Sequence, residues 1–432
     1  MVRRGALFGA AIMLLVLVPA LSSHALDAAR PAQERPDGPS VGGILRDPER
    51  NPVPDVDLLV ARDGEEIGVA TTAADGSWVL EVPEPGSYQV AIDVDTLPEG
   101  LGLRDPERQT LDDVRVREGF KPVNFLLGEG TSSAPTRVER LLNLAVAGLR
   151  IGLIIAVAAV GLSLVFGITG LTNFAHGELV TFGALIAYLL STSPVLGDVP
   201  LVVAGALAVV AGAGFGYLHE RAMFRPLRRR RTGNVALIVV TIGLSIFLRN
   251  LYLVIFGGGQ RQYDEFTIQV GLDLGPISPR AKDLVVIGIA AFVLVVVAVL
   301  LQRTRLGTGM RAVADSSELA SASGIDVNGI ILITWVSAGA LAALGGVLYG
   351  VSEQIESDLG FQLLLLMFAA VVLGGIGTAY GPMLGGLLIG LVSSLSTYWI
   401  DTKYKTGVAL AVLILVVLVR PQGILGKRER IG

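Results

Sequence analysis

Long apolar runs separated by short polar loops fill the chain from about residue 150 onward. Nine of them are long enough, or nearly long enough, to cross a bilayer, which takes about 20 helical residues. They lie near 150–167, 178–190, 200–217, 234–256, 283–301, 329–349, 361–373, 385–400 and 406–419. The pattern therefore predicts a multi-span α-helical membrane domain over residues 136–432, with roughly nine spans.

Residues 41–128 have a different pattern. Short β-prone runs such as VDLLVA, SWVLEV and SYQVAIDV alternate with Pro, Gly, Asn and Asp turn signals. Several short strands at this spacing are typical of an all-β sandwich. Residues 26–40 and 129–135 are rich in small, polar and proline residues and are expected to be linkers on either side of it.

The first 25 residues carry two arginines, a short apolar run and then Ser23, His24 and Ala25. A basic start, an apolar centre and a small-x-small site predict a secretory signal peptide, cleaved after Ala25. An uncleaved first membrane helix is the alternative, although the apolar run is short for a span.

Composition supports a membrane protein and narrows the chemistry. The 432 residues are 52% hydrophobic and 17% charged, with a mean hydropathy of +0.64. There is no Cys and there are only three His. Thiolate metal sites and disulfides are therefore impossible, and we expect no metal site and no catalytic constellation.

Basic residues predict the orientation, because loops on the cytoplasmic side carry an excess of Lys and Arg. Three segments, the last of them the C-terminus, hold thirteen basic residues, and the opposite loops hold five. The richer set is Arg221, Arg225, Arg228 to Arg231, Arg303, Arg305, Arg311, Arg420, Lys427, Arg428 and Arg430. With nine crossings this places the β-domain outside and the C-terminus in the cytoplasm. Basic residues confined to loops also argue against a nucleic-acid partner.

A polar interruption between two apolar runs is the main candidate for function. It contains Asn173, His176 and Glu178 among several glycines. Polar side chains and broken backbone at membrane depth are tolerated only in a protein-lined cavity or when buried. We interpret the segment as a discontinuous helix beside a solute path; a turn between two ordinary membrane helices is the alternative.

Two strings carry a family resemblance. FGITGLTNFAHGELVTFGA (166–184) and VVLGGIGTAYGPMLGGLLIG (371–390) resemble the first and late signatures of the permease subunits of branched-chain amino acid ABC importers. HERAMFRPLRRR and TIGLSIFLRN also resemble segments of that family. Our candidates for residues of the substrate path are Asn173, His176, Glu178, Thr241, Gly374 and Gly377. A cytoplasmic gate or structural bracing is the alternative role for Asn173, His176 and Glu178. For the glycines, close helix packing without a ligand is an equal alternative.

A loop between the fifth and sixth runs, residues 304–328, resembles the EAA-type loop with which such permeases contact their ATPase. Glu318, Ala320 and Gly324 match the acid, the second alanine and the glycine of that motif, whereas Leu319 replaces the usual alanine. A short helix with small residues suits docking into a groove. An ordinary loop helix is the alternative.

The resemblance implies the partners and the place of action. These would be cytoplasmic ATPase subunits, a second permease subunit and an external solute-binding protein, in the inner membrane of a bacterial cell, with membrane lipid around the spans. The chain contains no G-x-x-x-x-G-K-[ST] phosphate loop, so ATP hydrolysis would occur on a partner, and no cofactor is expected. Residues 41–128 resemble carboxypeptidase-regulatory-like domains, which typical members of the permease family lack.

Three other functions stay open at this point. A urea or amide permease would share the same architecture. A stand-alone ion-coupled transporter would need a buried carboxylate, for which Glu178 and Glu353 are the candidates. A surface adhesion or sensor protein would use the β-domain and keep the helices as an anchor, for which nine spans are excessive.

Overall fold

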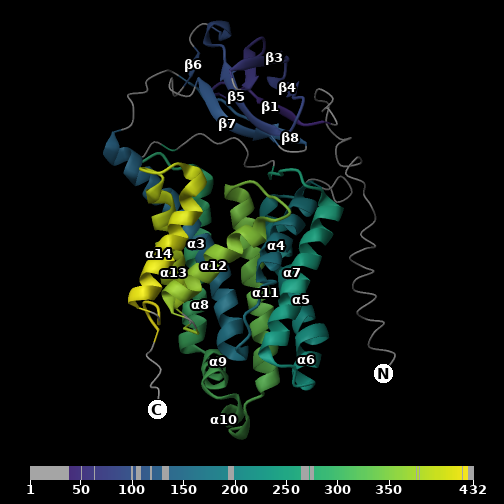
Figure 1. Cartoon of the computed structure of the whole chain (residues 1–432), viewed down its shortest axis with the longest axis vertical. Coiled ribbons are helices and arrows are strands. Elements are labelled where there is room, and N and C mark those ends of the chain that lie inside the picture. Colours follow the sequence, from purple (N-terminus) through teal and green to yellow (C-terminus); the bar gives the residue numbers. More distant parts are fainter. Residues whose placement is uncertain are drawn as a thin grey trace. The chain divides into compact units, whose positions relative to one another are not determined.

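The structure of the chain is a computed structural model, and it describes the greater part of the sequence. The described residues are 38–49, 51–62, 64–98, 101–103, 109–116, 119–128, 136–192, 199–263, 272, 277–375, 377–378, 380–420 and 422–426. The predicted signal peptide, the 129–135 linker and residues 26–37 of the first linker lie outside them. The described residues form a β unit and a helical unit (Figure 1).

The β unit consists of nine strands. They are β1 (Ser40–Ile44), β2 (Asp57–Arg62), β3 (Glu65–Thr71), β4 (Ser77–Glu81), β5 (Gly86–Ile92), β6 (Gly102–Leu103), β7 (Thr110–Val116), β8 (Phe120–Pro122) and β9 (Leu127–Gly128). One sheet has the order β4-β1-β8, a second has the order β3-β2-β5-β7, and β6 pairs with β9. The all-β prediction for this part of the chain is confirmed.

Alternation along the strands places one shared core between the sheets. In β5, Tyr88, Val90 and Ile92 are buried at every second position, and Trp78 of the other sheet belongs to the same apolar cluster. The turn before β4 depends on Gly76, whose φ is +75° and whose added Cβ would lie 2.3 Å from the carbonyl oxygen of Leu45. A side chain there would strain the backbone and clash with it.

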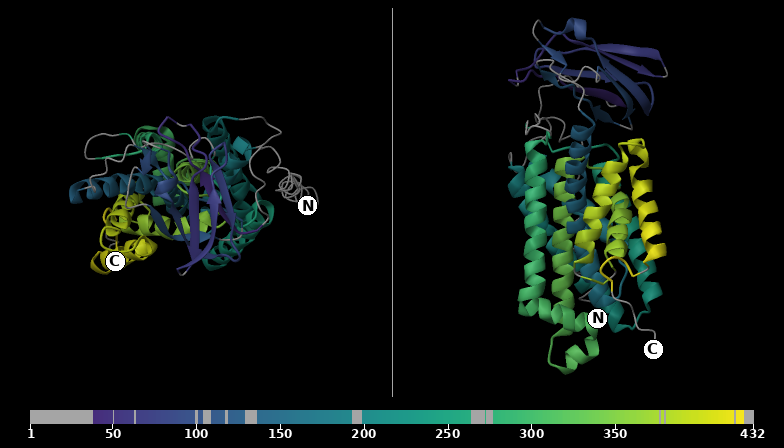
Figure 2. Two further views of the ribbon diagram at one scale, coloured as in Figure 1. Left: turned by 90° about the horizontal axis from the view of Figure 1, so that it is seen from above. Right: turned by 90° about the vertical axis from the view of Figure 1, so that its left-hand side faces the viewer.

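The helical unit contains the remaining elements. They are α3 (Arg137–Thr169), α4 (His176–Thr192), α5 (Leu201–Leu218), the π-helical turn η4 (His219–Phe224), α6 (Arg225–Arg229), α7 (Asn234–Phe256), α8 (Ala281–Arg303), α9 (Arg305–Asp315), α10 (Ser317–Ala322), α11 (Val327–Ser352), α12 (Leu359–Gly374), α13 (Gly381–Ser396), a short 3₁₀ turn at Thr402–Tyr404 and α14 (Lys405–Val419). Figure 2 shows α9 and α10 extending beyond the other helices at one end of this unit, which we call the α10 end.

Each of the nine predicted apolar runs coincides with or overlaps a helix. Within the described residues, six helices are long and apolar enough to span a membrane. They are 137–169, 201–229, 234–256, 281–303, 327–352 and 402–419, and α12 and α13 are shorter apolar helices. The chain is therefore a multi-pass helical membrane protein with an N-terminal β unit, and the count of nine spans stays a prediction.

Small residues bring the central helices into backbone contact. A Cβ added to Gly390 of α13 would lie 2.3 Å from Cα of Gly152 in α3, and one on Gly339 of α11 would lie 2.3 Å from the carbonyl oxygen of Gly212 in α5. Without a hydrophobic driving force between helices in lipid, such close packing provides much of the association. The same device joins α4 to α12 beside the candidate site.

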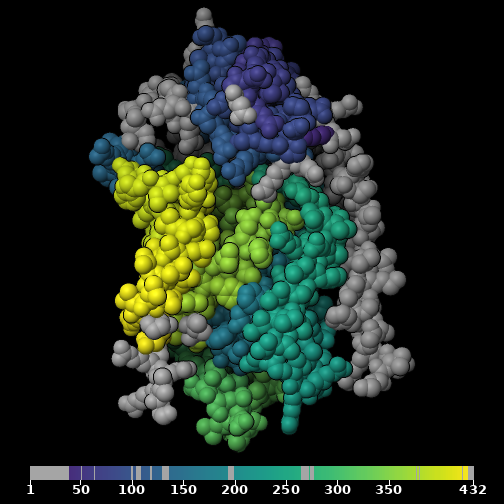
Figure 3. Space-filling model, in the orientation of Figure 1, coloured from purple at the N-terminus to yellow at the C-terminus, as the bar shows by residue number. Residues whose placement is uncertain are grey.

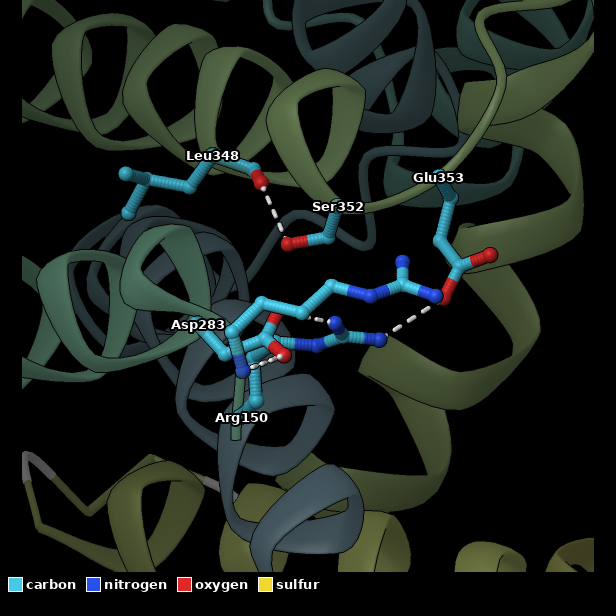
Figure 4. A network of polar contacts seen from close by, with 6 residues as sticks. Arg150, Asp283, Leu348, Ser352 and Glu353 are labelled. Carbon is cyan, nitrogen blue, oxygen red and sulfur yellow. Dashed lines mark hydrogen bonds and ion pairs between the residues drawn. The ribbon is translucent and has the colours of Figure 1, made fainter. Parts of the chain in front are cut away.

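Three helices are also braced by charge, as Figure 4 shows. Arg150 of α3 pairs with Asp283 in the first turn of α8 and donates to Glu353, just after α11, at 3.0 Å. The side chains of Arg150 and Asp283 are 13% and 14% exposed. We call these three residues the Arg150 brace; it lies at the end of α11 opposite to α10.

Candidate functional site: a polar seam beside a broken helix

The segment between α3 and α4 turns back into the middle of the helical unit. Nε2 of His176, the first residue of α4, lies 3.0 Å from the carbonyl oxygen of Ala158. Ala158 precedes the end of α3 by eleven residues, which is about 16 Å along the helix. The break therefore lies deep among the helices, as the interpretation of a discontinuous helix requires.

Three polar atoms in this segment lack a hydrogen-bond partner among the described residues. They are Nδ2 of Asn173, Nδ1 of His176 and Oε2 of Glu178, and all three side chains are fully buried. Since Ala158 offers a carbonyl oxygen, Nε2 of His176 is the donor and Nδ1 is left as an acceptor. A buried polar atom without a partner costs about 1–3 kcal/mol, so three within six residues indicate a site rather than simple packing.

Local hydrogen bonds hold the segment in place. Oδ1 of Asn173 accepts the N–H of Ala175 at 3.0 Å, and its carbonyl oxygen accepts the N–H of His176 at 3.3 Å. Asn side chains commonly make this type of turn before a helix. At the start of α4, a Cβ on Gly177 would lie 2.4 Å from the carbonyl oxygen of Gly360, so α12 contacts α4 directly there.

Helix α7 supplies the other wall of the site. Thr241 Oγ1 accepts the N–H of Phe174 at 3.2 Å, Ser245 Oγ donates to Glu178 Oε1 at 3.0 Å, and the Tyr252 hydroxyl donates to the carbonyl oxygen of Glu178 at 3.1 Å. Thr241 and Ser245 are four residues apart, so they share a face of the helix. We call the contact between α7 and residues 172–178 the polar seam.

The structure brings four of the six predicted path residues together. Asn173, His176, Glu178 and Thr241 lie at or next to the polar seam, whereas Gly374 and Gly377 belong to the connection between α12 and α13. Gly374 packs against Gly381, and its carbonyl oxygen accepts the N–H of Leu425 at 2.9 Å. Gly377 has φ +74°, so for these two glycines packing and backbone conformation explain the residue type.

Sequence reasoning missed Ser245, Tyr252, Arg249 and Asp358. Arg249 lies one turn beyond Ser245 on α7, and its Nη2 is 3.4 Å from Oδ2 of Asp358, next to the start of α12. The signal was present in the sequence, because Thr241, Ser245 and Arg249 repeat every four residues in an otherwise apolar helix. A polar stripe at that period marks one face of a helix.

In the space-filling view, α12 lies in a hollow between α14 and the helices α5 and α7 (Figure 3). The residues exposed on α12 include Phe361 and Leu365, which are 47% and 49% exposed. Arg249 reaches this side of α12, since its guanidinium lies 5.1 Å from the centroid of the Phe361 ring. The polar seam is therefore continuous with an open face of the helical unit.

The predicted coupling residues form a small exposed helix at the α10 end. The Ser316 hydroxyl caps α10 by accepting the N–H of Leu319 at 3.2 Å. Glu318 is exposed and Ala320 is buried. Gly324 ends the turn with φ +84°, and the N–H of Ile325 returns to the carbonyl oxygen of Ala320 at 3.0 Å. Glycine suits this left-handed position after a helix.

Within the described part of the chain no group of three His, Asp or Glu residues is placed to hold a metal ion. The ring of His219 makes packing contacts with aromatic side chains. It packs edge-on against Phe215, with 4.4 Å between ring centroids, and stacks near Trp335 at 6.2 Å. Its Nδ1–H donates to the carbonyl oxygen of Phe215 at 2.9 Å.

Comparison with known proteins identifies relatives of the helical unit. The family described as "Branched-chain amino acid transport system / permease component" matches residues 144–417. The high-affinity branched-chain amino acid permease BraD of Pseudomonas aeruginosa is 35% identical over 294 residues, covering 65% of this chain and 94% of that protein. LivH of Escherichia coli K12 is 34% identical over 295 residues, with the same coverage.

A more distant relative is named for a different solute. The ribose import permease RbsC of Escherichia coli K12 is 27% identical over 282 residues, covering 61% of this chain and 81% of that protein. No solved structure gives a significant match. The β unit lies outside the residues matched by the family.

Proposed function

Since the chain belongs to the family of branched-chain amino acid transport permease components, we propose that it forms half of the membrane path of an ATP-driven importer for these or related amino acids. The observation that carries the proposal is the set of three buried, unpartnered polar atoms in the broken segment, which lies within the matched residues. A path for a polar solute needs such groups where lipid would otherwise exclude it. The chain itself makes and breaks no bond in the solute.

The experiment is uptake of labelled leucine, isoleucine and valine into vesicles that contain this chain with its ATPase and solute-binding partners. Uptake should require ATP and the binding protein, and an excess of unlabelled amino acid should compete where urea, amides and ribose do not. Competition by ribose or urea alone would mean that this permease carries that solute instead of branched-chain amino acids.

Glu178→Gln tests the path at the polar seam. The amide oxygen can still accept from Ser245, so we expect stability within about 1 kcal/mol of the unmodified chain. Uptake should fall at least tenfold, because the unpartnered carboxyl oxygen is replaced. Ser393→Ala, a buried hydroxyl on α13, is the control and should leave uptake within twofold. Normal uptake by Glu178→Gln would remove this residue from the path.

An ion-coupled transporter is the second candidate function, and Glu178 is the observation that favours it. A buried carboxyl without a second partner is what proton or sodium coupling needs. The other candidate, Glu353, is committed to Arg150. Uptake driven by a proton or sodium gradient in vesicles that hold no ATPase partner would establish this alternative and exclude the importer.

The ATPase partner is proposed to dock on α10, with Glu318 and Gly324 as the coupling residues. The support is an exposed acid and a glycine-capped turn on a short helix that extends from the α10 end. Glu318→Lys should keep the fold, because the side chain is exposed, and should abolish solute-stimulated ATP hydrolysis. Gln302→Lys, an exposed change at the end of α8, serves as the control. Unchanged stimulation in Glu318→Lys would place docking elsewhere.

We further propose that the α10 end and the C-terminus are cytoplasmic and the β unit external, with a second permease subunit closing the hollow of Figure 3. The distribution of basic residues supports this orientation. Labelling of single cysteines introduced at Glu318 and at Asp75 in intact cells tests it. Labelling at position 318 by an impermeant reagent would show that the α10 end is external and would refute the proposed orientation.

For the β unit we propose a contact with the solute-binding protein. It is an independently cored all-β sandwich with an acidic composition and, among its described residues, no group of metal ligands. Deletion of residues 41–127 with the leader retained should lower uptake at limiting binding protein but not at saturation. Undiminished uptake at both concentrations would refute the contact.

A further inference from the structure

Arg249 is in an unusual place for a charged side chain. It lies fifteen residues after the first residue of α7 and seven residues, about 10 Å, before the last one, inside an apolar segment. Its side chain is 42% exposed on the open face. An arginine at that depth is costly in lipid, and such residues face a cavity, a partner or a solute path.

The contacts of Arg249 leave most of its hydrogen-bonding capacity unused. Within the described residues it makes one hydrogen bond, to Asp358 at 3.4 Å, although a guanidinium carries five N–H donors. Its plane lies over Phe361 at 5.1 Å. A guanidinium held by one long contact keeps a free fork, which is the geometry that binds a carboxylate with two hydrogen bonds.

Two carboxyl groups lie along the same stretch of α7 as this guanidinium. Asp358 is its hydrogen-bond partner, and Glu178 lies beside the preceding turn of α7, where Ser245 Oγ donates to its Oε1 at 3.0 Å. Oε2 of the fully buried Glu178 has no partner among the described residues. The cluster thus offers a guanidinium, a carboxylate and a buried carboxyl oxygen without a partner, so it can accept a ligand that carries both charges.

An apolar surface adjoins the charged groups. Phe361 and Leu365 are separated by one turn of α12 and both are about half exposed. Residues four apart lie on the same helix face. A ligand whose charged end reaches Arg249 would rest an aliphatic chain on this surface, whereas a sugar or urea carries no ionised groups to match the opposite charges of Arg249 and Asp358.

We propose that Arg249, Asp358 and Glu178 form a recognition site for a zwitterionic α-amino acid with an apolar side chain. The carboxylate of the solute binds the free N–H donors of Arg249, and its ammonium group binds Asp358 and the buried, unpartnered Oε2 of Glu178. Phe361 and Leu365 contact the aliphatic side chain. The ion pair between Arg249 and Asp358 opens when the solute enters and closes behind it, so both charges stay compensated. The inference deepens the proposed function and rests on it.

The test measures leucine uptake and ATP hydrolysis in the same vesicles, with the ATPase and the loaded binding protein present. In Arg249→Gln we expect the maximal uptake rate to fall at least tenfold, while ATP hydrolysis stimulated by the binding protein stays within twofold. Arg140→Gln is the matched control, because Arg140 is an exposed arginine over Tyr398, at 5.5 Å from the ring centroid. That variant should keep both rates within twofold.

A charge-exchange variant separates recognition from a purely structural ion pair. Arg249→Asp combined with Asp358→Arg keeps opposite charges at the two positions but reverses their order relative to Phe361 and Glu178. We expect uptake to stay at least tenfold reduced. Recovery to within twofold would show that the pair only holds α7 to α12 and would overturn the inference.

Other outcomes are equally decisive. Leucine uptake by Arg249→Gln within twofold of the unmodified chain would overturn the recognition site and leave the importer proposal standing. Failure of the unmodified chain to transport any zwitterionic amino acid, with transport of a sugar or urea instead, would overturn the proposed function. A variant that loses uptake and also elutes as aggregate is replaced by Arg249→Lys, which keeps the charge but not the fork; uptake at the unmodified rate would then contradict the inference.

Discussion

Two arginines of the helical unit illustrate two uses of charge in a membrane protein. Arg150 is 13% exposed and pairs with carboxylates from two other helices. Arg249 is 42% exposed and, within the described residues, makes a single hydrogen bond of 3.4 Å beside its contact with the Phe361 ring. Since a buried charge must be fully compensated, the first arrangement holds helices together. Arg249 keeps N–H donors free and accessible. The exposed fraction of an arginine and the number of its carboxylate partners therefore together distinguish a brace from a binding site.

The largest expected effect is loss of the brace. Arg150→Met leaves Asp283 without its ion-pair partner in a largely buried position, so we expect about 3 kcal/mol of destabilisation. Arg249→Met should cost less than about 1 kcal/mol, because its pair is partly exposed. Thermal unfolding in detergent compares the two, and equal losses would erase the distinction between them.

The apolar part of this architecture could be predicted from sequence, because hydrophobicity and length determine which runs become membrane helices. The positions of Asn173, His176, Glu178 and Thr241 were predictable for a similar reason: polar residues are conspicuous inside apolar runs. The Arg150 brace was not, since its members are 133 and 203 residues apart in sequence. Only the packing of α3, α8 and α11 brings them together.

The two glycines predicted to line the path illustrate a second limit of prediction from the sequence. Gly374 and Gly377 fall in a string that resembles the family signature, yet their contacts are those of a tight connection between α12 and α13. A glycine-rich string indicates close backbone approach but not what approaches. Arg249 could have been found from its four-residue spacing with Thr241 and Ser245, whereas Asp358 lies outside the strings that resemble the family, and only its contact with Arg249 in the fold reveals it.

The next largest effect concerns the close contact between α4 and α12. Gly177→Val would force a branched side chain against the carbonyl oxygen of Gly360, 2.4 Å from its Cβ. We expect about 1–3 kcal/mol of destabilisation and displacement of α4 from α12. Gly243→Val on the open face of α7 is the control, because nothing lies within 4 Å of its Cβ. Similar melting temperatures for both variants would contradict the close approach.

Within the brace, the two carboxylates should differ. Asp283 is 14% exposed and also accepts the N–H of Arg280 at 3.3 Å, whereas Glu353 is 40% exposed. Asp283→Asn should therefore destabilise the chain by about 1–2 kcal/mol and Glu353→Gln by less than about 1 kcal/mol. Melting temperatures of the two single variants measure the difference. The reverse order would mean that Glu353 carries the brace.

The smallest expected effect is in the β unit, at the exposed carboxylate of Asp75. Its stabilising effect can be compared with those of the carboxylates that pair with Arg150 and Arg249. Hydrogen bonds from the Ser77 hydroxyl and N–H, at 2.5 and 2.9 Å, lower the pKa of Asp75 below its usual 3.8. A lowered pKa stabilises the fold above about pH 4, and that contribution is lost as the pH falls below 3.8.

Asp75→Asn should therefore lower stability by less than about 1 kcal/mol at pH 7 and by less still at pH 3. Unfolding of the full chain, followed by fluorescence of Trp78 in a variant without Trp335 and Trp399, provides the measurement. A larger effect at pH 3 than at pH 7 would have the wrong sign for a carboxylate stabilised in its charged form.

Helix α11 connects features that lie far apart. It begins three residues after Gly324 and ends one residue before Glu353, and its 26 residues form a rod about 39 Å long. Because the rod is one uninterrupted helix, pushing its first turn sideways by about 2 Å tilts it by only about 3°. The helix therefore joins the glycine-capped turn at one end of the unit to the Arg150 brace at the other as a single rigid element.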